Sequence, residues 1–571
     1  MQTYTYEAIV IGSGAAGYNA ACRLKEQGVQ VALVTEGVNC GTSRNTGSDK
    51  QTYYKLGLGG SAPDSVRQMA QDLFNGGSVD GDNALCEAAL STRCFMHLCE
   101  LGVPFPVNRY GEYVGYKTDH DPFARATSAG PLTSKFMTEA LQKRAEELAI
   151  AVYDGYRAIQ LLKHEERVCG LVCLKDGECV AFRCGNIVMA TGGPAGVYAD
   201  SVYPECHTGS SGLAIAAGAT MQNLALWQYG LASVQPRWNV SGTYMQVLPR
   251  LVSIDENGQE HDFLWEQFTD KYHGLLLVFL KGYQWPFDPK KAQDGSSLID
   301  MLVYRERVER NRRVYLDFTK NPFEIEFTKL SKEAFEYLDK AGAVFGTPIE
   351  RLAKMNEPAI ELYRSKGVDL YTQYLEIALC AQHNNGGIAV DAWWQSSVRG
   401  LFAVGECAGT HGIARPGGSA LNAGQVGGLR AAQYIAKHPN APVDKAVFSA
   451  LLSEVQVKTD ENAGAKLHQA RRRMSDAAAA IREPSAINAL LQETREELSC
   501  TTDFRLAEVL VTQAAVLTAM AHPNSDPQTV QEVTLKNGEF TVSERAVRPI
   551  PEEDDCFETV WHSYRESESI F

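Results

Sequence analysis

The chain has 571 residues, enough for about three or four domain-sized units, and 44% of its residues are hydrophobic, as in a globular protein with large cores. Its formal net charge of −15 argues against nucleic acid as the main partner, because a phosphate backbone is bound by a basic surface. No apolar run reaches the length of a membrane span, Leu275–Leu280 being the densest, and the N-terminus has neither a signal-peptide nor a twin-arginine pattern. We therefore expect a cytoplasmic protein that is not integral to a membrane.

The start of the chain is typical of a dinucleotide-binding unit. The apolar run at 7–11 predicts a buried strand, which leads through a glycine turn into an alanine-rich helix, and residues 31–36 predict a second strand. In such a unit Gly12 permits the tight turn, Gly14 lets the backbone approach a pyrophosphate, and Gly17 lets the helix pack on the strand.

The two ends of this unit indicate which nucleotide it binds. Free N–H groups at the start of the helix, where Ala15 and Ala16 lie, face the anion. Glu36 ends the second strand, where it can accept hydrogen bonds from both hydroxyls of a ribose and would repel a 2′-phosphate. NADP is therefore not expected.

The segments that follow are helical and then strand-like. Residues 64–150 have mainly helical periodicity, and 151–190 alternate like strands. From about 231 to 371 the chain has more aromatic and charged residues and fewer glycines, which indicates an inserted domain. Glycine-rich sequence returns after it, and residues from 441 are helical to about 521. The last fifty residues are polar, and we expect an irregular strap over the surface.

The cysteines do not indicate a metal centre. Cys169, Cys173, Cys179 and Cys184 flank a turn between two strand-like runs, as small residues of a hairpin do. No two of the fourteen cysteines have the CxxC spacing, so neither a zinc ribbon nor an iron–sulfur cluster is expected.

A second glycine-rich segment follows the insertion. Residues 400–406 predict a strand that ends in Gly405-Glu406, and the loop 415–418 opens a long helix, which makes a second anion-facing helix start. Two such helix starts far apart in the chain fit a long, two-ended ligand, which indicates FAD. The first would hold the pyrophosphate, while N–H groups of Ala420 and Leu421 would reach the pyrimidine edge of the flavin. Glu406 would hold the ribityl chain.

These motifs resemble those of the flavoprotein family of fumarate reductase, succinate dehydrogenase and L-aspartate oxidase, over about residues 5–437. The matching pieces are the first glycine turn, Ala190-Thr191-Gly192-Gly193, Thr208-Gly209, Gly386-Gly387, Phe402-Ala403-Val404-Gly405-Glu406, His411-Gly412 and Arg415-Pro416-Gly417-Gly418. The resemblance implies an α/β fold. A Rossmann-like FAD-binding domain would occupy 1–230 and 372–440, an inserted α+β capping domain 231–371, and a C-terminal helical domain with its tail 441–571. The cap would close over the flavin and exclude water.

The resemblance also implies how FAD is held. Further positions expected to contact it are Ser43, Thr46, Gly47, Ala158, Ala190, Thr191, Gly192, Gly405 and Ser419. Residues 43–54 contain no histidine, to which some relatives tether FAD, so we expect FAD to be bound non-covalently. Arg44, Lys50 and Tyr54 are candidates for polar groups near the flavin ring.

The positions that bind the substrate in this family carry different residues in this chain. Gln228-Tyr229-Gly230-Leu231-Ala232-Ser233 stands where relatives that handle fumarate or succinate have a carboxylate-binding His-Pro-Thr-Gly. Leu298 stands before Asp300 near the position of the proton-donating Arg of the family. Unless Arg305 or Arg307 takes that place, fumarate reduction is not expected.

Three candidate catalytic residues remain. Arg415 matches the carboxylate-binding Arg of the family and could clamp an anionic substrate. His383 and His411 lie in the corresponding loops, and either could move a proton, although His411 could equally well only brace its loop.

The sequence thus predicts an FAD-dependent oxidoreductase that exchanges a hydride between flavin N5 and a small, anionic organic substrate other than fumarate or succinate. Two alternatives remain open. The chain could be an electron-transfer subunit that works with an iron–sulfur partner protein, or a flavin-bound regulatory protein whose catalytic cap has decayed.

Overall fold

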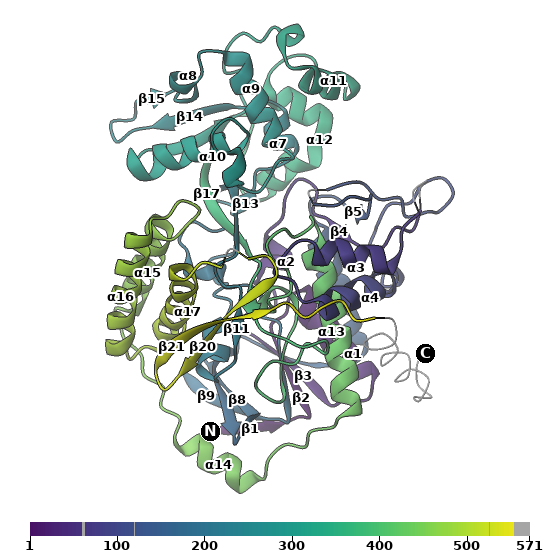
Figure 1. The fold of residues 1–571 in the computed structure, drawn as a ribbon, viewed down its shortest axis with the longest axis vertical. Helices are drawn as coiled ribbons and strands as arrows, with labels where there is room; N and C mark the ends of the chain where they lie inside the picture. The colour runs from purple at the N-terminus through teal and green to yellow at the C-terminus, as the bar shows by residue number, and fades with distance from the viewer. Residues whose placement is uncertain (60–62, 119, 525, 553–571) are drawn as a thin grey trace.

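The computed structural model describes residues 1–59, 63–118, 120–524 and 526–552. Its lower part in Figure 1 is built on a five-stranded parallel sheet, and the cap lies above it. The order of the sheet is β19-β10-β2-β3-β6. The strands are β2 (Ala8–Ile11), β3 (Val31–Thr35), β6 (Ala151–Asp154), β10 (Asn186–Met189) and β19 (Leu401–Ala403). Four of the five are short and almost wholly apolar, as expected of strands covered on both faces.

Two helices pack beside this sheet, and each follows one of the predicted glycine segments. They are α1 (Ala15–Glu26) and α13 (Ser419–Lys437), which pack on each other although four hundred residues separate them. A second sheet, of order β1-β9-β8-β7, packs against the central sheet. Its strands are β1 (Gln2–Thr5), β7 (Arg157–His164), β8 (Arg167–Lys175) and β9 (Glu178–Arg183).

The cysteine hairpin is confirmed. Lys175 pairs with Glu178 across a tight turn between β8 and β9, and no thiol of the described residues is in a disulfide. Burial raises the pKa of the Cys169 thiol to about 11, so the group behaves as a small apolar side chain.

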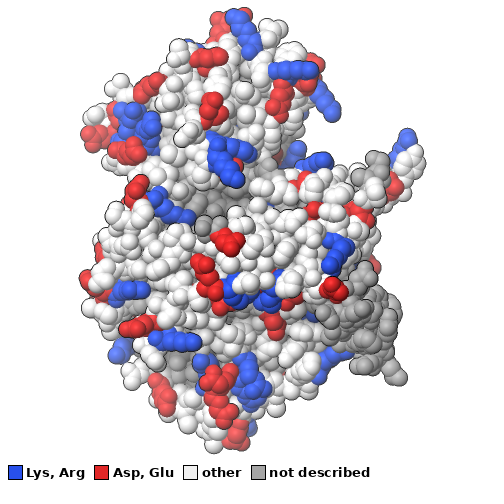
Figure 2. Space-filling view, in the orientation of Figure 1, with Lys and Arg blue, Asp and Glu red and all other residues white. Residues whose placement is uncertain are grey.

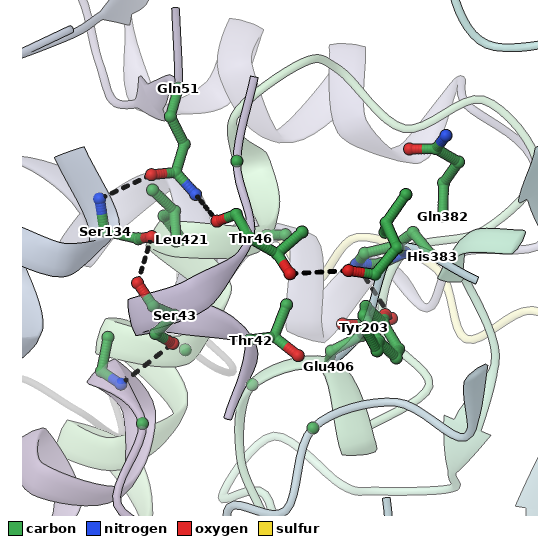
Figure 3. A pocket seen from close by; sticks show the side chains of 18 of the residues that line it. Thr42, Ser43, Thr46, Gln51, Ser134, Tyr203, Gln382, His383, Glu406 and Leu421 are labelled. Atoms are coloured by element: carbon green, nitrogen blue, oxygen red, sulfur yellow. Dashed lines mark hydrogen bonds and ion pairs between the residues drawn. The ribbon is translucent and has the colours of Figure 1, made fainter. Parts of the chain in front are cut away.

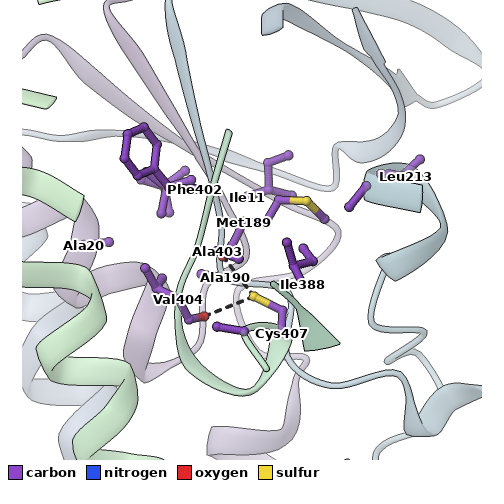
Figure 4. Close-up of a cluster of buried hydrophobic side chains, with 14 of the residues drawn as sticks. Ile11, Ala20, Met189, Ala190, Leu213, Ile388, Phe402, Ala403, Val404 and Cys407 are labelled. Atoms are coloured by element: carbon purple, nitrogen blue, oxygen red, sulfur yellow. Dashed lines mark hydrogen bonds between the residues drawn. The ribbon is translucent and has the colours of Figure 1, made fainter. Parts of the chain in front are cut away.

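The carboxyl ends of β2, β10 and β19 meet in a tightly packed apolar cluster (Figure 4). Ile11, Met189 and Ala403 contribute to it, one from each strand. The Cys407 thiol donates to the backbone carbonyls of Met189, at 3.0 Å, and Val404, at 3.2 Å. This packing fixes the turn that carries Gly405 and Glu406.

Helices α3 (Val66–Phe74) and α4 (Gly81–Glu100) lie on the right of Figure 1, with the short pair β4 (Tyr53–Tyr54) and β5 (Ala126–Thr127) near them. Helix α5 (Thr133–Glu147) packs on α1, α2 (Thr42–Asn45) and α4.

The cap has its own six-stranded sheet, of order β13-β12-β17-β16-β14-β15. Its strands are β12 (Trp227–Ser233), β13 (Trp238–Asn239), β14 (Arg250–Ile254), β15 (Glu260–His261), β16 (Arg313–Asp317) and β17 (Leu375–Asn384). Its helices are α7 (Thr243–Gln246), α8 (Leu264–Gln267), α9 (Lys271–Leu280), α10 (Ser297–Tyr304), α11 (Lys332–Lys340) and α12 (Pro348–Ser365). The predicted boundary after residue 230 falls inside β12, which runs from the lower core into the cap core together with β17.

The C-terminal region is helical as predicted, with α14 (Lys445–Ser453), α15 (Ala463–Ala477), α16 (Pro484–Cys500) and α17 (Phe504–Ala521). The expectation that no apolar run has membrane-spanning length was wrong for α17, which is 18 residues long with a mean hydropathy of 1.4. It is the one such helix among the described residues, and 72% of it is buried inside the protein, as in a core helix.

The expected irregular strap was also wrong for residues 529–546. Strands β20 (Thr529–Lys536) and β21 (Glu539–Ala546) form a hairpin, and β20 pairs with β11 (Met221–Gln222), which pairs with β18 (Gly387–Ile388). Helix α6 (Ser211–Ala216) packs beside this sheet. The tail from 553 lies outside the described residues.

Candidate functional site

A cavity of about 810 Å³ joins the two glycine segments to the cap. Of the residues predicted to bind FAD, all but Gly17 and Ser419 line it. The visible face of the molecule is hollowed where the cap meets the lower part, and charges of both signs are interspersed over that face (Figure 2).

The first glycine turn has the geometry that the sequence predicts. Gly12 has φ +109°, and its N–H donates to the Val34 carbonyl at 2.9 Å. A Cβ on Gly17 would lie 1.9 Å from the Gly12 carbonyl oxygen, so only glycine lets α1 pack this closely. The N-cap residue of α1 is Gly14, which has no side chain to cap the helix. The Ala15 N–H donates to Ser43 Oγ at 3.2 Å, which holds the two walls of the cavity together.

One end of the cavity is the end predicted to bind the ribose and adenine. Glu36 and Ala158 line this end, and the carboxylate of Glu36 forms an ion pair with Arg157. Sequence reasoning did not foresee Arg157, because its approach depends on how β7 lies beside β3. The hydrogen bonds from Glu36 to a ribose remain a prediction.

The second glycine segment packs against the first at the cavity wall, since a Cβ on Gly405 would lie 3.0 Å from the Ala16 Cβ. Glu406 Oε1 accepts hydrogen bonds from the Tyr203 hydroxyl and, at 3.1 Å, from the Asn384 N–H. Burial raises the pKa of the Glu406 carboxyl to about 7. Gly418 has φ +94° and opens α13 without a side-chain cap, so the first turn of the helix presents Ala420 and Leu421 to the cavity. Ser419 is buried beside them, and its Oγ has no hydrogen-bond partner in the described protein.

The loop after β3 forms a third wall (Figure 3). Ser43 accepts through its carbonyl from the Ser134 hydroxyl at 2.7 Å, and the Thr46 hydroxyl donates to the Val202 carbonyl at 2.7 Å. A Cβ on Gly47 would lie 2.7 Å from the Trp238 ring. The loop is therefore held on both sides, and these contacts fix the shape of this wall.

The residues that follow β10 form the last part of the cavity wall. Ala190, Thr191 and Gly192 follow β10, and Gly192 has φ +72° with the His207 ring packed against it. Glycine-lined walls, two uncapped helix starts and buried polar atoms without partners together suit a long dinucleotide such as FAD.

Arg415 and the two histidines come together at the cap end. Arg415 Nη2 donates to Gln228 Oε1 at 2.6 Å, while its Nε is buried without a partner in the described protein. Arg415 and His383 line the cavity. His411 does not; its ring lies behind that of His383, with 4.9 Å between the ring centres.

Both imidazoles are neutral at neutral pH. Burial, together with the nearby charge of Arg415, lowers the pKa of His383 well below its usual value and that of His411 to about 3. His383 Nδ1 lies 2.9 Å from Asn385 Oδ1, and its Nε2 has no hydrogen-bond partner in the described protein. An anion beside Arg415 would offset that charge and raise the pKa of His383.

Several other sequence candidates lie away from the cavity. Arg305 pairs with Glu309, and Arg307 pairs with Asp200 and Glu376. Leu298 packs on the cap core.

Arg44 and Tyr54 do not line the cavity, so neither is a polar group beside the flavin as the sequence suggested. Arg44 bonds Gln142, and the Tyr54 hydroxyl donates to Asp121 at 3.2 Å. Lys50 does line it, at the exposed rim.

Sequence reasoning missed the aromatic side chains that the cap contributes. Phe279, Tyr283, Trp285 and Tyr337 line the cavity. The aromatic richness of this segment was visible in the sequence, but only the fold shows which rings face the FAD-binding part. No group of three or more metal-ligating side chains occurs among the described residues.

Comparison with known proteins gives a consistent picture. Residues 7–421 match the family model described as FAD binding domain. The chain is 25% identical over 472 residues to a subunit of the fumarate reductase (CoM/CoB) of Methanothermobacter marburgensis, covering 80% of this chain and 77% of that protein. It is 25% identical over 444 residues to L-aspartate oxidase of Agrobacterium fabrum, covering 76% and 74%.

The fold has solved counterparts. Mycobacterium smegmatis Sdh1 superposes with a TM-score of 0.72 at 19% identity, over 98% of both chains. Adenylylsulfate reductase from Archaeoglobus fulgidus superposes with a TM-score of 0.61 at 16% identity, over 96% of both. At these identities the likeness concerns the fold alone.

Proposed function

Since the chain belongs to the FAD-binding flavoprotein family that includes fumarate reductase, succinate dehydrogenase flavoprotein and L-aspartate oxidase, it is an FAD-dependent oxidoreductase, and we propose that its substrate is a small organic anion other than fumarate or succinate. When bound, FAD supplies hydride exchange at its N5 atom. The residues of this chain bind, orient and shield the two reactants.

The guanidinium of Arg415 is the observation that carries the proposal. It lies at the cap end of the cavity, bonded to Gln228, with an Nε that no described protein atom satisfies. A buried guanidinium is stabilised by an anionic partner, and a planar carboxylate can accept two parallel hydrogen bonds from it. Arg415 would thus hold the substrate in a fixed orientation.

His383 would handle the proton. Its Nε2 is free of protein hydrogen bonds, and its Nδ1 is fixed by Asn385, so the ring is oriented. In the free protein its lowered pKa keeps it neutral. Burial is the main cause of this lowering, and the charge of Arg415 adds to it, so an anion on Arg415 would raise the pKa of His383 by offsetting that second cause. His411 would support the ring from behind.

The cap argues against fumarate and succinate. After Gln228-Tyr229 this chain has Gly230-Leu231-Ala232-Ser233, where relatives acting on these acids have the carboxylate-binding His-Pro-Thr-Gly. No arginine of the described cap lines the cavity, because Arg305 and Arg307 are engaged elsewhere. A dicarboxylate would then find no second cation among the described residues on the cap side of the cavity.

The test is an anaerobic titration of the reduced protein. Candidate anions are added, and flavin reoxidation is followed by absorbance. Fumarate should reoxidise the flavin no faster than buffer, and rapid reoxidation by fumarate would refute the proposal. Arg415→Lys should weaken binding of any active anion by at least tenfold, while Arg305→Gln, a cation outside the cavity, serves as the matched control.

A partner protein is the second part of the proposal. The Methanothermobacter relative is named as a subunit, and the described residues of this chain hold no cluster of metal ligands. We infer that an iron–sulfur protein exchanges electrons with the flavin. Co-purification with a cysteine-rich protein that reduces the bound flavin would support this, whereas rapid turnover of the isolated chain with a nicotinamide donor alone would argue against it.

A further inference from the structure

We propose that the anion bound by Arg415 carries an aromatic or similarly planar apolar group, and that this group packs on the aromatic wall, defined here as Phe279, Tyr283, Trp285 and Tyr337. This inference rests on the proposed function. A 3-arylpropanoate or its 3-arylacrylate counterpart is the simplest molecule of the class.

Three of the four rings of the aromatic wall contact one another. The Phe279 ring packs edge-on against Tyr337, with centres 5.4 Å apart, and against Tyr283 at 6.2 Å. The Tyr337 hydroxyl donates to Gln246 Oε1 at 2.8 Å. Rings held in this way need little further ordering when a ligand packs on them.

Trp285 connects this wall to the anion site. A Cβ on Gly230 would lie 2.3 Å from Trp285 Nε1, so the indole packs directly on the backbone of β12. The Trp285 Nε1 is buried without a partner in the described protein. The loop that carries Trp285 is anchored below by Lys281, whose Nζ lies 2.6 Å from Asp300 and 3.2 Å from the Gln284 carbonyl oxygen.

The spacing along β12 sets the size of the ligand. Gln228, which bonds Arg415, and Gly230, which supports Trp285, are two residues apart and share one face of the strand. Their Cα atoms are therefore about 7 Å apart. A single small molecule can span this distance with its carboxylate on Arg415 and a ring beside Trp285.

The charges of the cap favour an apolar body over a second carboxylate. Within the described cap residues that line the cavity, Glu333 is the only charged side chain, and it accepts a hydrogen bond from the Tyr283 hydroxyl. A second carboxylate would meet this acid and aromatic faces instead of a cation. The exposed lysines of the cavity, Lys50 and Lys117, lie on the FAD-binding side.

The experiment measures equilibrium binding to the oxidised holoprotein, so it does not depend on turnover. 3-Phenylpropanoate, butanoate and succinate are titrated, and the change in the flavin absorbance band gives each dissociation constant. We expect 3-phenylpropanoate to bind at least tenfold more tightly than either other acid. Equal binding of 3-phenylpropanoate and butanoate, or tighter binding of succinate, would overturn the inference even if Trp285 variants fail to fold.

Variants then locate the effect. Trp285→Ala should reduce the preference for 3-phenylpropanoate over butanoate to about threefold or less, and Trp285→Phe should keep most of it. Trp265→Phe, in the cap but outside the cavity, is the matched control. An unchanged preference in Trp285→Ala would overturn the inference.

The two proposals fail in different ways. If a short anion exchanges hydride with the flavin but 3-phenylpropanoate does not bind, the inference is wrong and the proposed function stands. If no anion binds and Arg415→Lys changes nothing, the proposed function is wrong, and the inference falls with it.

Discussion

Gly17→Ala tests the FAD-binding turn, because the structure separates its effect on cofactor binding from its effect on folding. The new Cβ would lie 1.9 Å from the Gly12 carbonyl oxygen, whereas real Cβ atoms stay beyond 3.0 Å. Helix α1 must therefore retreat from β2 by about 1 Å or more. The N–H groups at its start move with it.

The two consequences differ in size. Overpacking lowers the free energy of unfolding by about 1–3 kcal/mol, but alanine at a helical position returns about 1 kcal/mol relative to glycine. The net loss of stability is thus about 0–2 kcal/mol. A hydrogen bond from an N–H to a charged phosphate is worth about 1.5–3 kcal/mol, and a 1 Å shift removes it. We expect the FAD dissociation constant to rise by about ten- to hundredfold for each bond lost.

The assay is reconstitution of the apoprotein with FAD, followed by flavin fluorescence, alongside urea unfolding of the same apoprotein. Gly464→Ala in α15 is the matched control, since a Cβ there has nothing within 4 Å. It should leave FAD binding unchanged. If Gly17→Ala binds FAD within twofold of the parent protein, α1 does not hold the pyrophosphate, and the role given to its N-terminus is wrong.

Three further predictions follow from the same structure. Acid precipitation should release the FAD into the supernatant, because residues 43–54 offer no histidine for a covalent link; a yellow pellet would contradict this. His411→Gln should flatten the pH dependence of stability. The pKa of His411 is about 3 in the folded protein and about 6.5 in the unfolded chain. Through this histidine the parent protein loses about 1.4 kcal/mol of unfolding free energy per pH unit as the pH falls below 6.5. Urea titrations at pH 6.5 and 5 should therefore show the variant losing less. Lys281→Met should lower the free energy of unfolding by about 3–5 kcal/mol by leaving Asp300 buried and unpaired, and adding Asp300→Asn should restore more than half; no recovery would mean that the pair is not the cause.

Local features of the fold followed from the sequence, because each is encoded within a few residues. Gly12 and Gly17 predict their turn and helix contact from spacing alone, and the helix at 419–437 follows from its glycine-rich start. Two features were missed. The hairpin of β20 and β21 turns locally at Asn537-Gly538, a signal that the prediction of an irregular strap overlooked, whereas the pairing of β20 with Met221, some three hundred residues earlier, has no local signal. Helix α17 is apolar over most of its length, and length alone cannot assign such a helix to a core or a membrane.

The site residues also fall into those that the sequence predicted and those that it did not. Arg415 and His383 were predicted to lie together, and they do line one cavity, while His411 lies one layer behind. Arg157 and Trp285 were not foreseen as site residues. Each enters through packing between elements that no local spacing describes, and Trp285 depends on Gly230 having no side chain.

The strand pair β12 and β17 explains why the two halves of the site are coupled. Gln228 pairs with His383 where the strands leave the lower core, and Leu231 and Ile377 are already part of the cap core a few residues further on. Gln228, which bonds the proposed anion-binding Arg415, and His383, which is proposed to move the proton, therefore lie on the same two strands that carry the cap. A cap movement that shifts Trp285, which packs on Gly230, must also strain Gln228, because only Tyr229 separates these two residues of β12. Recognition of the substrate by the cap is therefore coupled to the position of the anion on Arg415. A substitution in the cap that accepts a different substrate must leave the β12 segment from Gln228 to Gly230 in place.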